Sequence, residues 1–444
     1  MAHIIPFKGL RYNNDKIKDL RLVTTPPYDV ISRSAQENYY NMHPNNVIRL
    51  EFGKEYDDDN ENDNKYTRAA SYLNHWIDNG VLLFEEKPAL YLYEQIFTLK
   101  NGEVKSRKGI ISLVKIEEFS KGVILPHEET LSKAKVDRYN LMSTTYSNFS
   151  QIFSLYMDPE KNITNIINQL AKEPAHISFQ SDDNITENLW VITDESTIIN
   201  IQKFFEQKQL FIADGHHRYE TALNFRNKLR EENPHYSPND LFNYVMMMLV
   251  DMDDPGLVVF PTHRVIKDLN VFDEVHLMNE LKENFFIEKI PFNSTLLLNE
   301  KEMSGMIEQS LNHKHNEKVF ALYTGKEYYY LLTLKNVNVI AEALPQKSAA
   351  YQNLDVSILH TLILEKILGI DMENMANQKN LTYTRNADEA IHWVKTGKFQ
   401  CAFLLNATKV YEIKNVSLAN EKMPQKSTYF YPKLTTGLVM NKFM

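Results

Sequence analysis

Short apolar runs alternate with segments of helical periodicity along the whole chain. The dipeptide Asn101-Gly102 lies between two such runs, residues 88–97 and 108–114, and predicts an antiparallel hairpin. Further strands are expected at 151–156, 189–193, 209–213, 242–250, 258–261, 319–323, 328–334 and 400–405. Helices are expected at 161–170, 196–207, 219–231, 277–284, 356–368 and 387–395. This mixture predicts an α+β (mixed α/β) fold.

The length of the chain predicts several domains. Its 444 residues correspond to roughly three domains of ordinary size. We expect an N-terminal α/β segment over residues 1–105, a central core over 106–268 and a C-terminal α/β domain over 269–444.

Glycine is scarce, and this limits which glycine-rich phosphate-binding motifs the chain can contain. The chain has 13 glycines in 444 residues, about 3%, against a usual ~7%. No two glycines stand two residues apart, and no G-x-x-x-x-G-K-[ST] segment exists. A Walker-type P-loop, a Rossmann fingerprint and a protein-kinase glycine loop of standard sequence are therefore excluded.

Charge, cysteine content and apolar run length narrow the class of protein further. The net charge of −9 argues against nucleic acid as a partner, since a phosphate backbone calls for a basic face. The single cysteine, Cys401, excludes an intramolecular disulfide and CxxC chemistry and reads as a buried strand residue. No apolar run reaches the ~18 residues of a membrane span, and no secretory leader is evident. We expect a cytoplasmic protein without a membrane partner; the oligomeric state stays open.

The strongest chemical signal is an apolar strand that runs into Asp214-Gly215 and then into a helix. Asp214 is expected to cap the helix and Gly215 to permit the tight turn. The free N–H groups of the first turn favour an anion, and His216, His217 and Arg218 add donors and positive charge there. The segment predicts phosphate binding. The alternatives are a plain capped helix with two surface histidines, or a metal site, for which adjacent histidines about 100° apart are poorly placed; we predict no metal ligands.

A second segment, Pro126-His127-Glu128-Glu129, is followed by three cations. One interpretation is ordinary helix-start chemistry, with a proline and acidic residues in the first turn. The other is a carboxylate that acts as a general base beside cations that bind phosphate. Glu129 is also spaced to pair with Lys133 at i,i+4 and, less well, with Lys135. The cations are Lys133, Lys135 and Arg138.

Two further clusters place polar side chains beside prolines or after a strand. Pro26-Pro27 predicts an extended turn that holds Tyr28 and Asp29 rigidly. Thr262, His263 and Arg264 directly follow an expected strand, which is a common position for functional side chains. Both clusters also have a purely structural interpretation, as a turn and as a strand end.

Together these motifs resemble a known family. Segments 26–32 (Pro-Pro-Tyr-Asp-Val-Ile-Ser), 127–130 (His-Glu-Glu-Thr), 214–222 (Asp-Gly-His-His-Arg-Tyr-Glu-Thr-Ala) and 260–264 (Phe-Pro-Thr-His-Arg) are similar to the uncharacterised prokaryotic family labelled domain of unknown function 1015. Residues 108–265 also resemble the ParB/sulfiredoxin-like free serine kinases, which carry His-Glu-x and Asp-Gly-His-His-Arg. This resemblance implies a ParB/sulfiredoxin-like central core with additional N- and C-terminal α/β segments.

The resemblance implies specific roles for residues of this chain. Glu128 would act as the base on the serine hydroxyl, Asp214 would be essential, and His216, His217 and Arg218 would contact the nucleotide phosphates. The substrates would be free L-serine or O-phosphoserine with ATP or ADP, and Mg²⁺ would bridge the phosphates. Further substrate-binding candidates are His127, Glu129, Lys133, Lys135, Arg138, Tyr28, Asp29, His263 and Arg264.

The function inferred from the residues and the resemblance together is phosphoryl transfer on free serine. The same site with water as acceptor would make a phosphoserine phosphatase, and a site without chemistry would make a nucleotide-binding regulatory protein. Sulfiredoxin chemistry is disfavoured because His216 stands where a catalytic cysteine would be needed. The kinases end in a Pro-Lys-Thr-Thr-Arg-like stretch, whereas this chain has Pro-Lys-Leu-Thr-Thr-Gly at 432–437 and no arginine.

Overall fold

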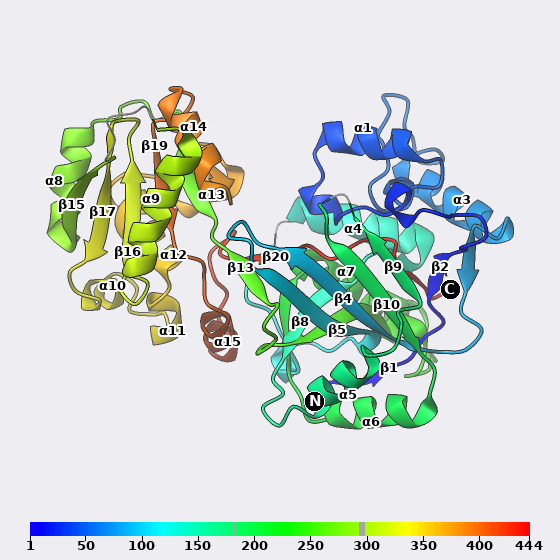
Figure 1. The fold of residues 1–444 in the computed structure, drawn as a ribbon. Coiled ribbons are helices and arrows are strands. Elements are labelled where there is room, and N and C mark those ends of the chain that lie inside the picture. The colour runs from blue at the N-terminus through cyan, green and yellow to red at the C-terminus, as the bar shows by residue number, and fades with distance from the viewer. Residues whose placement is uncertain (131, 182, 293–297) are drawn as a thin grey trace. The chain divides into compact units, whose positions relative to one another are not determined.

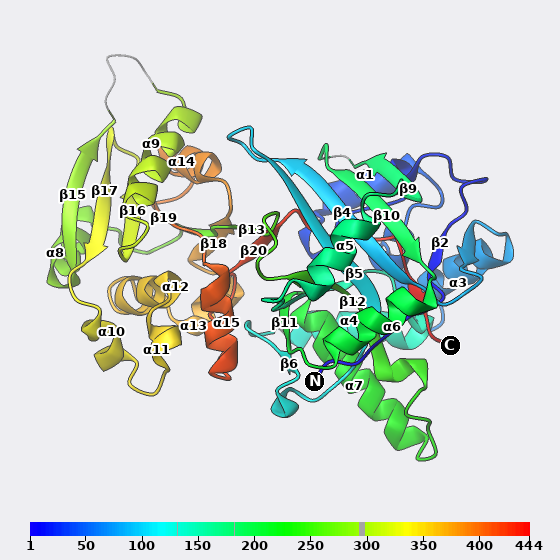
Figure 2. The same ribbon diagram turned by 60° about the horizontal axis from the view of Figure 1, so that its bottom comes forward.

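A computed structural model describes residues 1–130, 132–181, 183–292 and 298–444. The chain forms two compact units (Figures 1 and 2). The first unit comprises residues 1–126, 130–258 and 432–444, and the second comprises residues 127–129 and 259–431. The second unit is thus inserted into the first along the chain. The predicted mixed α/β class is confirmed, while the three-segment division of the sequence stays a prediction.

A nine-stranded mixed sheet forms the centre of the first unit. Its strand order is β6 (Ile124–Leu125), β11 (Leu210–Asp214), β8 (Ile152–Tyr156), β12 (Tyr244–Asp251), β5 (Val104–Lys115), β4 (Leu90–Thr98), β10 (Thr186–Ile192) and β9 (Ile177–Gln180), with β1 (Ile4–Ile5) paired to β5. All residues of β12 are buried, which explains its apolar sequence from Tyr244 to Val250. The predicted hairpin is confirmed, because β4 and β5 pair antiparallel around the 101–102 turn.

The helices of the first unit surround this sheet. They are α1 (Arg33–Met42), α2 (Ile48–Glu51), α3 (Lys65–Asp78), α4 (Ser132–Thr145), α5 (Asn162–Leu170), α6 (Glu195–Phe205) and α7 (His216–Glu232). Short 3-10 turns are η1 (Leu20–Leu22), η2 (Tyr28–Val30), η3 (Phe119–Lys121) and η4 (Leu241–Asn243). Buried side chains of α4–α7 share one apolar core with β4, β5 and β12, so these four helices pack against the sheet; α5 and α6 lie together on it in both ribbon views (Figures 1 and 2).

Small strand pairs bring distant parts of the first unit together. β2 (Leu10–Tyr12) pairs with β3 (Leu82–Phe84), and β7 (Ser147–Asn148) pairs with β21 (Asn441–Lys442) near the end of the chain. Isolated bridges join Leu10 to Met440 and Thr25 to Thr436. The last residues of the chain are therefore an integral part of the first unit. They reach it from β20 (Tyr429–Tyr431), which pairs with β13 (Val258–Phe260).

The second unit is built on a six-stranded sheet. Its order is β15 (Phe285–Pro291), β17 (Tyr328–Leu334), β16 (Val319–Tyr323), β19 (Cys401–Leu405), β14 (His263–Ile266) and β18 (Leu381–Thr384). The helices are α8 (Glu274–Asn284), α9 (Glu300–His313), α10 (Asn338–Ala343), α11 (Ala349–Gln352), α12 (Asp355–Ile358), the π-helix η5 (Leu359–Glu365), α13 (Met372–Asn377), α14 (Ala387–Lys395) and α15 (Val410–Leu418). Apolar side chains of α9 and α14 pack side by side against one face of this sheet. Cys401 is buried in β19, as predicted.

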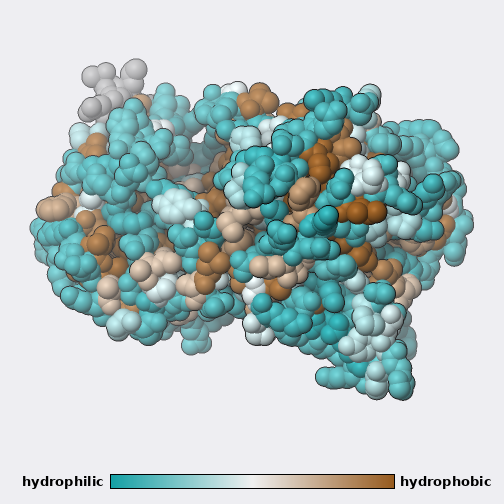
Figure 3. All heavy atoms as spheres, turned by 90° about the horizontal axis from the view of Figure 1, so that it is seen from below, coloured by the Kyte–Doolittle hydropathy of each residue, from teal (hydrophilic) through white to brown (hydrophobic). Residues whose placement is uncertain are grey.

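The face of the molecule shown in Figure 3 is mostly polar. On the face shown in Figure 3, hydrophilic side chains predominate and apolar residues form small, separate patches. Within the described ranges, no helix has the length and apolar character needed to cross a membrane.

Candidate functional site

The turn between β11 and α7 carries the strongest sequence motif. β11 ends at Asp214, Gly215 follows with φ of 95°, and α7 begins at His216. Such a left-handed φ is readily adopted only by glycine. The prediction that Asp214 caps the helix is wrong, because Gly215 occupies the cap position and makes no side-chain cap hydrogen bond. The carboxylate of Asp214 binds cations instead.

Two cations converge on Asp214 within the first unit. The ammonium of Lys433 contacts Asp214 Oδ1, and Arg218 Nη2 donates to Oδ2 at 2.8 Å. The three side chains are 11–17% exposed. Burial alone would raise the pKa of Asp214, but the attraction of Lys433 and Arg218 outweighs it and holds that pKa below its ordinary value. Asp214 therefore stays ionised and gathers two cations beside the first turn of α7.

Arg218 folds back over Gly215. A Cβ atom added at Gly215 would lie 2.9 Å from Arg218 Nε and about as close to the rest of the guanidinium. Glycine at this position thus serves two needs, a positive φ and room for the arginine head group.

The substitution Gly215→Ala is expected to destabilise the protein by more than backbone strain alone. Strain at positive φ costs about 1–2 kcal/mol, and displacement of Arg218 adds to that cost. Gly122→Ala is the matched control, because Gly122 has φ of 63° and nothing within 4 Å of an added Cβ. Urea unfolding of both variants measures the difference. Equal losses would mean that the guanidinium moves aside freely.

Arg218 also connects this turn to a second buried group, Glu51. Its Nη1 donates to the carbonyl of Gln151 at 2.8 Å and to Ser150 Oγ at 3.1 Å, and Ser150 Oγ donates to Glu51 Oε1 at 2.9 Å. Burial raises the pKa of Glu51, although Arg138 and Arg218 oppose this shift. Glu51 is a site residue that the sequence did not reveal.

The N-terminal Pro-Pro segment joins the same network through Arg138. The Arg138 guanidinium lies 3.9 Å from the centre of the Tyr28 ring and ion-pairs with Glu51 and Asp137. Burial raises the pKa of Tyr28 to about 12. The expected extended turn is only partly correct, because a 3-10 turn starts at Tyr28 directly after Pro27. Asp29 is exposed and acts on this network only through its charge, which adds to the rise in the pKa of Tyr28.

The remaining candidates near α4 and α7 have separate positions. Lys135 forms an ion pair of 3.0 Å with Glu220 of α7 and not with Glu129. The side chain of Lys133 lies outside the described residues, so its predicted pairing with Glu129 stays a prediction. His216 is buried, and His217 is half-buried.

The second unit holds the His-Glu-Glu segment. His127 is buried, with Nε2 3.0 Å from Thr428 Oγ1, and Glu128 Oε1 accepts a hydrogen bond of 3.0 Å from the backbone of Lys426. These residues do not form the first turn of a helix: α4 begins only at Ser132, and Glu128 forms a bridge to Met423. Glu129 is exposed.

Arg264 is buried in the second unit and interacts with Glu128. Its Nε lies 3.2 Å from His360 Nε2, and Nη2 donates to the Lys426 carbonyl at 3.2 Å. Burial lowers the pKa of Arg264 to about 10, and attraction to Glu128 acts against that shift. His263 is buried in β14, where Nδ1 accepts from the backbone of Leu405. His360 and Lys426 were not predicted as neighbours of this segment.

Lys433 contacts Asp214 directly but was not among the predicted site residues. It stands in the Pro-Lys-Leu-Thr-Thr-Gly stretch, which the sequence comparison with the kinases had already drawn attention to. A recess of about 80 Å³ lies beside it, with Thr25, Glu187 and Thr435 among its lining residues. Thr435 Oγ1 donates to the buried Glu187 at 2.8 Å. The C-terminal stretch thus contributes to the Asp214 cluster.

The arrangement of His, Cys, Asp and Glu side chains decides whether the described residues can hold the expected Mg²⁺ ion. Among the residues that the structure describes, no group of three or more His, Cys, Asp or Glu side chains could hold a metal ion. Mg²⁺ commonly binds through one or two carboxylates together with substrate phosphates. The described residues thus do not form a dedicated magnesium cage.

Comparison with known proteins gives one extensive match and several weak ones. A family model described as "Protein of unknown function (DUF1015)" matches residues 4–357. No curated protein matches the chain.

Similar solved structures include a free serine kinase mutant in complex with AMP (12% identity, 69% of this chain and 84% of that one, TM-score 0.33) and a free serine kinase mutant in complex with ADP (13%, 76% and 90%, 0.33). Another is a conserved hypothetical protein from Pyrococcus furiosus (12%, 70% and 89%, 0.32). These scores are too low to carry function from those proteins to this chain.

Proposed function

Since the chain belongs to the DUF1015 family, whose description assigns no activity, we propose a function from its own residues and from the resemblance of its motifs to the free serine kinases: it binds a phosphate-bearing small molecule at the start of α7 and transfers a phosphoryl group between a nucleotide and free L-serine. The observation that carries this proposal is the convergence of Arg218 and Lys433 on Asp214 beside the N-terminus of α7.

The first turn of α7 is suited to an anion. The N–H groups of this turn and the helix dipole present partial positive charge, and this helix has no acidic residue in its first turn. Arg218 offers a planar, multiply donating head group, and Lys433 offers a compact charge. Asp214 keeps both cations in place, and together with the helix start they form a preorganised phosphate cradle.

In the proposed reaction, Glu128 accepts the proton of the serine hydroxyl. The serine oxygen forms a bond to the terminal phosphorus of ATP or ADP, while the bond from phosphorus to the bridging oxygen breaks. The products are O-phosphoserine and ADP or AMP. Arg218, Lys433, His216 and His217 stabilise the transferring group. The role of Glu128 rests on the resemblance of the His-Glu-Glu segment to the kinases.

Magnesium would bind mainly through the nucleotide phosphates, since the described residues form no cage for it. When bound, it would neutralise phosphate charge. The proposed phosphoryl-transfer reaction therefore predicts that turnover requires magnesium.

An assay of the purified chain tests the proposal. The protein is incubated with ATP or ADP, with and without L-serine, and separately with O-phosphoserine alone. We expect O-phosphoserine to form only when both nucleotide and serine are present. Release of phosphate from O-phosphoserine alone would show that the activity is that of a phosphatase and not of a kinase. Nucleotide binding without turnover would indicate a regulatory protein instead of an enzyme. The absence of both nucleotide binding and turnover would contradict the phosphate cradle itself.

A further inference from the structure

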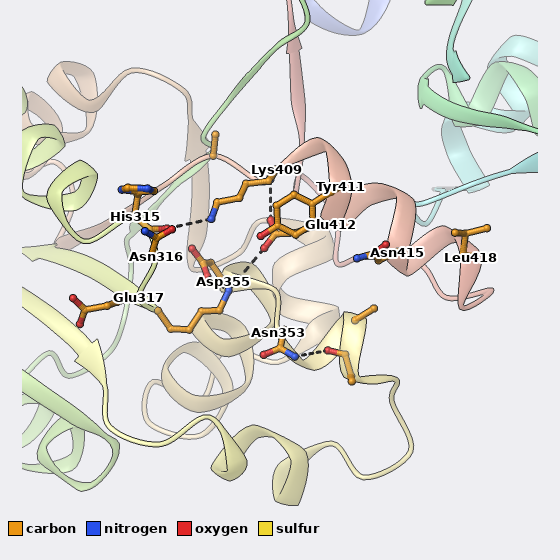
Figure 4. Close-up of a pocket in the computed structure, with 14 residues that line it drawn as sticks. His315, Asn316, Glu317, Asn353, Asp355, Lys409, Tyr411, Glu412, Asn415 and Leu418 are labelled. Atoms are coloured by element: carbon orange, nitrogen blue, oxygen red, sulfur yellow. Dashed lines mark hydrogen bonds and ion pairs between the residues drawn. The ribbon is translucent and has the colours of Figure 1, made fainter. Parts of the chain in front are cut away.

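A separate cavity lies wholly within the second unit (Figure 4). It has a volume of about 700 Å³, within the usual range of small-molecule sites. Three stretches of chain line it: residues 315–318 before β16, residues 349–355 around α11 and the start of α12, and residues 407–418 around α15. None of the residues proposed above for phosphoryl transfer lines this cavity.

A half-buried ion cluster forms one wall of the cavity. Lys318 Nζ lies 2.9 Å from Asp355 Oδ1 and 3.8 Å from Glu412 Oε1. Burial raises the pKa of both carboxyl groups, while Lys318 opposes the shift. Two carboxylates share one lysine here, so oxygen lone pairs remain for another donor.

Lys409 supplies a second cation in the same cavity. Its Nζ donates to the carbonyl of His315 at 3.2 Å, and Figure 4 shows this side chain above the Asp355–Glu412 pair. An ammonium group has three N–H donors. Among the described residues, the Lys409 ammonium donates a hydrogen bond to this carbonyl. Lys409 also attracts the Asp355 carboxylate electrostatically. Half-buried groups of both signs therefore lie close together in one cavity.

This arrangement selects against ligands of a single charge sign. An anion would meet Asp355 and Glu412, and a cation would meet Lys318 and Lys409. A molecule that carries both an ammonium and a carboxylate satisfies both sets of groups. The rim adds amides of Asn353 and Asn415 and the exposed Tyr411, which can contact a side chain of variable chemistry.

We infer that this cavity binds a small zwitterion of the free amino-acid class, with its carboxylate on Lys409 and its ammonium on Asp355 and Glu412. The site is additional to the proposed phosphoryl-transfer site and does not depend on it. It gives the protein a second small-molecule site in the inserted unit.

Titration calorimetry of the full chain tests this inference. L-Alanine, L-leucine, L-glutamate and L-lysine are titrated singly; serine is left out because it is the proposed substrate of the other site. We expect at least one of them to bind. Its N-acetyl derivative, which lacks the ammonium, and its amide, which lacks the carboxylate, are each expected to bind about ten- to a hundredfold more weakly.

Variants locate the binding. Lys409→Met and Asp355→Asn are each expected to weaken it about ten- to a hundredfold. Lys414→Met is the matched control, because Lys414 lies in α15, the helix whose N-cap residue is Lys409, but does not line the cavity. Asp214→Asn is expected to leave this binding unchanged, which separates the result from the fate of the phosphoryl-transfer proposal. Absence of binding by all four amino acids, equal binding of the blocked derivatives, or equal effects of Lys409→Met and Lys414→Met would overturn the inference.

Discussion

The substitution Glu128→Gln is expected to lower the rate of O-phosphoserine formation by about 10²–10⁴-fold, the usual contribution of a general base. Glutamine has the same shape, and its carbonyl oxygen can still accept the hydrogen bond from the Lys426 backbone. The fold is therefore expected to persist, and nucleotide binding is expected to stay near that of the unchanged protein. Turnover is followed by the O-phosphoserine formed, and binding by calorimetry.

Glu129→Gln provides the matched control for this prediction. Glu129 is the adjacent carboxylate and is exposed, so its loss removes the same charge from the same segment. We expect it to change turnover only slightly. If the two variants lose activity equally, the effect arises from charge in this segment and Glu128 is not the base.

The substitution Asp214→Asn is expected to reduce turnover by about 10²–10³-fold, as for loss of one preorganised electrostatic group. The amide can bind only one of the two cations well, so Lys433 and Arg218 lose their common anchor. We also expect a loss of about 2–3 kcal/mol in the free energy of unfolding, because two charge-assisted contacts are weakened. Normal turnover in this variant would contradict the proposed cradle.

The pH dependence of stability gives an independent check on Asp214. Its pKa is lowered in the folded protein, so the stabilisation it provides is present above the ordinary aspartate value of about 3.9 and is lost as the pH falls towards the lower folded value. The difference in unfolding free energy between the unchanged protein and Asp214→Asn is thus expected to be constant near neutral pH and to shrink below about pH 4. Urea unfolding across this range measures it. A difference that grew in acid would have the wrong sign for an ion-paired carboxylate.

The sequence predicted those elements whose signal is local. The β4–β5 hairpin follows from apolar runs around Asn101-Gly102, and β12 was expected from its apolar run, which ends at Val250. Strand β15 was missed because it is an edge strand that is largely exposed, so its polar residues break the apolar pattern. Helix α15 was missed because its short apolar face gives little periodicity.

The candidate site was predicted only where its residues are adjacent in sequence. The Asp-Gly-His-His-Arg turn was recognised, but the role of Asp214 as a cap was wrong, because its carboxylate binds the distant Lys433 together with the local Arg218. Lys433 contacts Asp214 from 219 residues away, and hydrogen bonds through Ser150 connect Glu51 to Arg218. No spacing rule connects residues so far apart, and only the resemblance of the 432–437 stretch to the kinases hinted at Lys433.

The interleaving of the two units has a consequence for biosynthesis. A chain made from its N-terminus contains β11 and Asp214 long before Lys433, which is 219 residues later, and the whole inserted part of the second unit is made in between. At ordinary translation rates of about 5–20 residues per second, the delay is roughly 10–40 s. Throughout that time Asp214 has at most one of its two cations. Prematurely terminated products are thus expected to lack a complete anion cradle, so the cell would not acquire activity from unfinished copies of this protein.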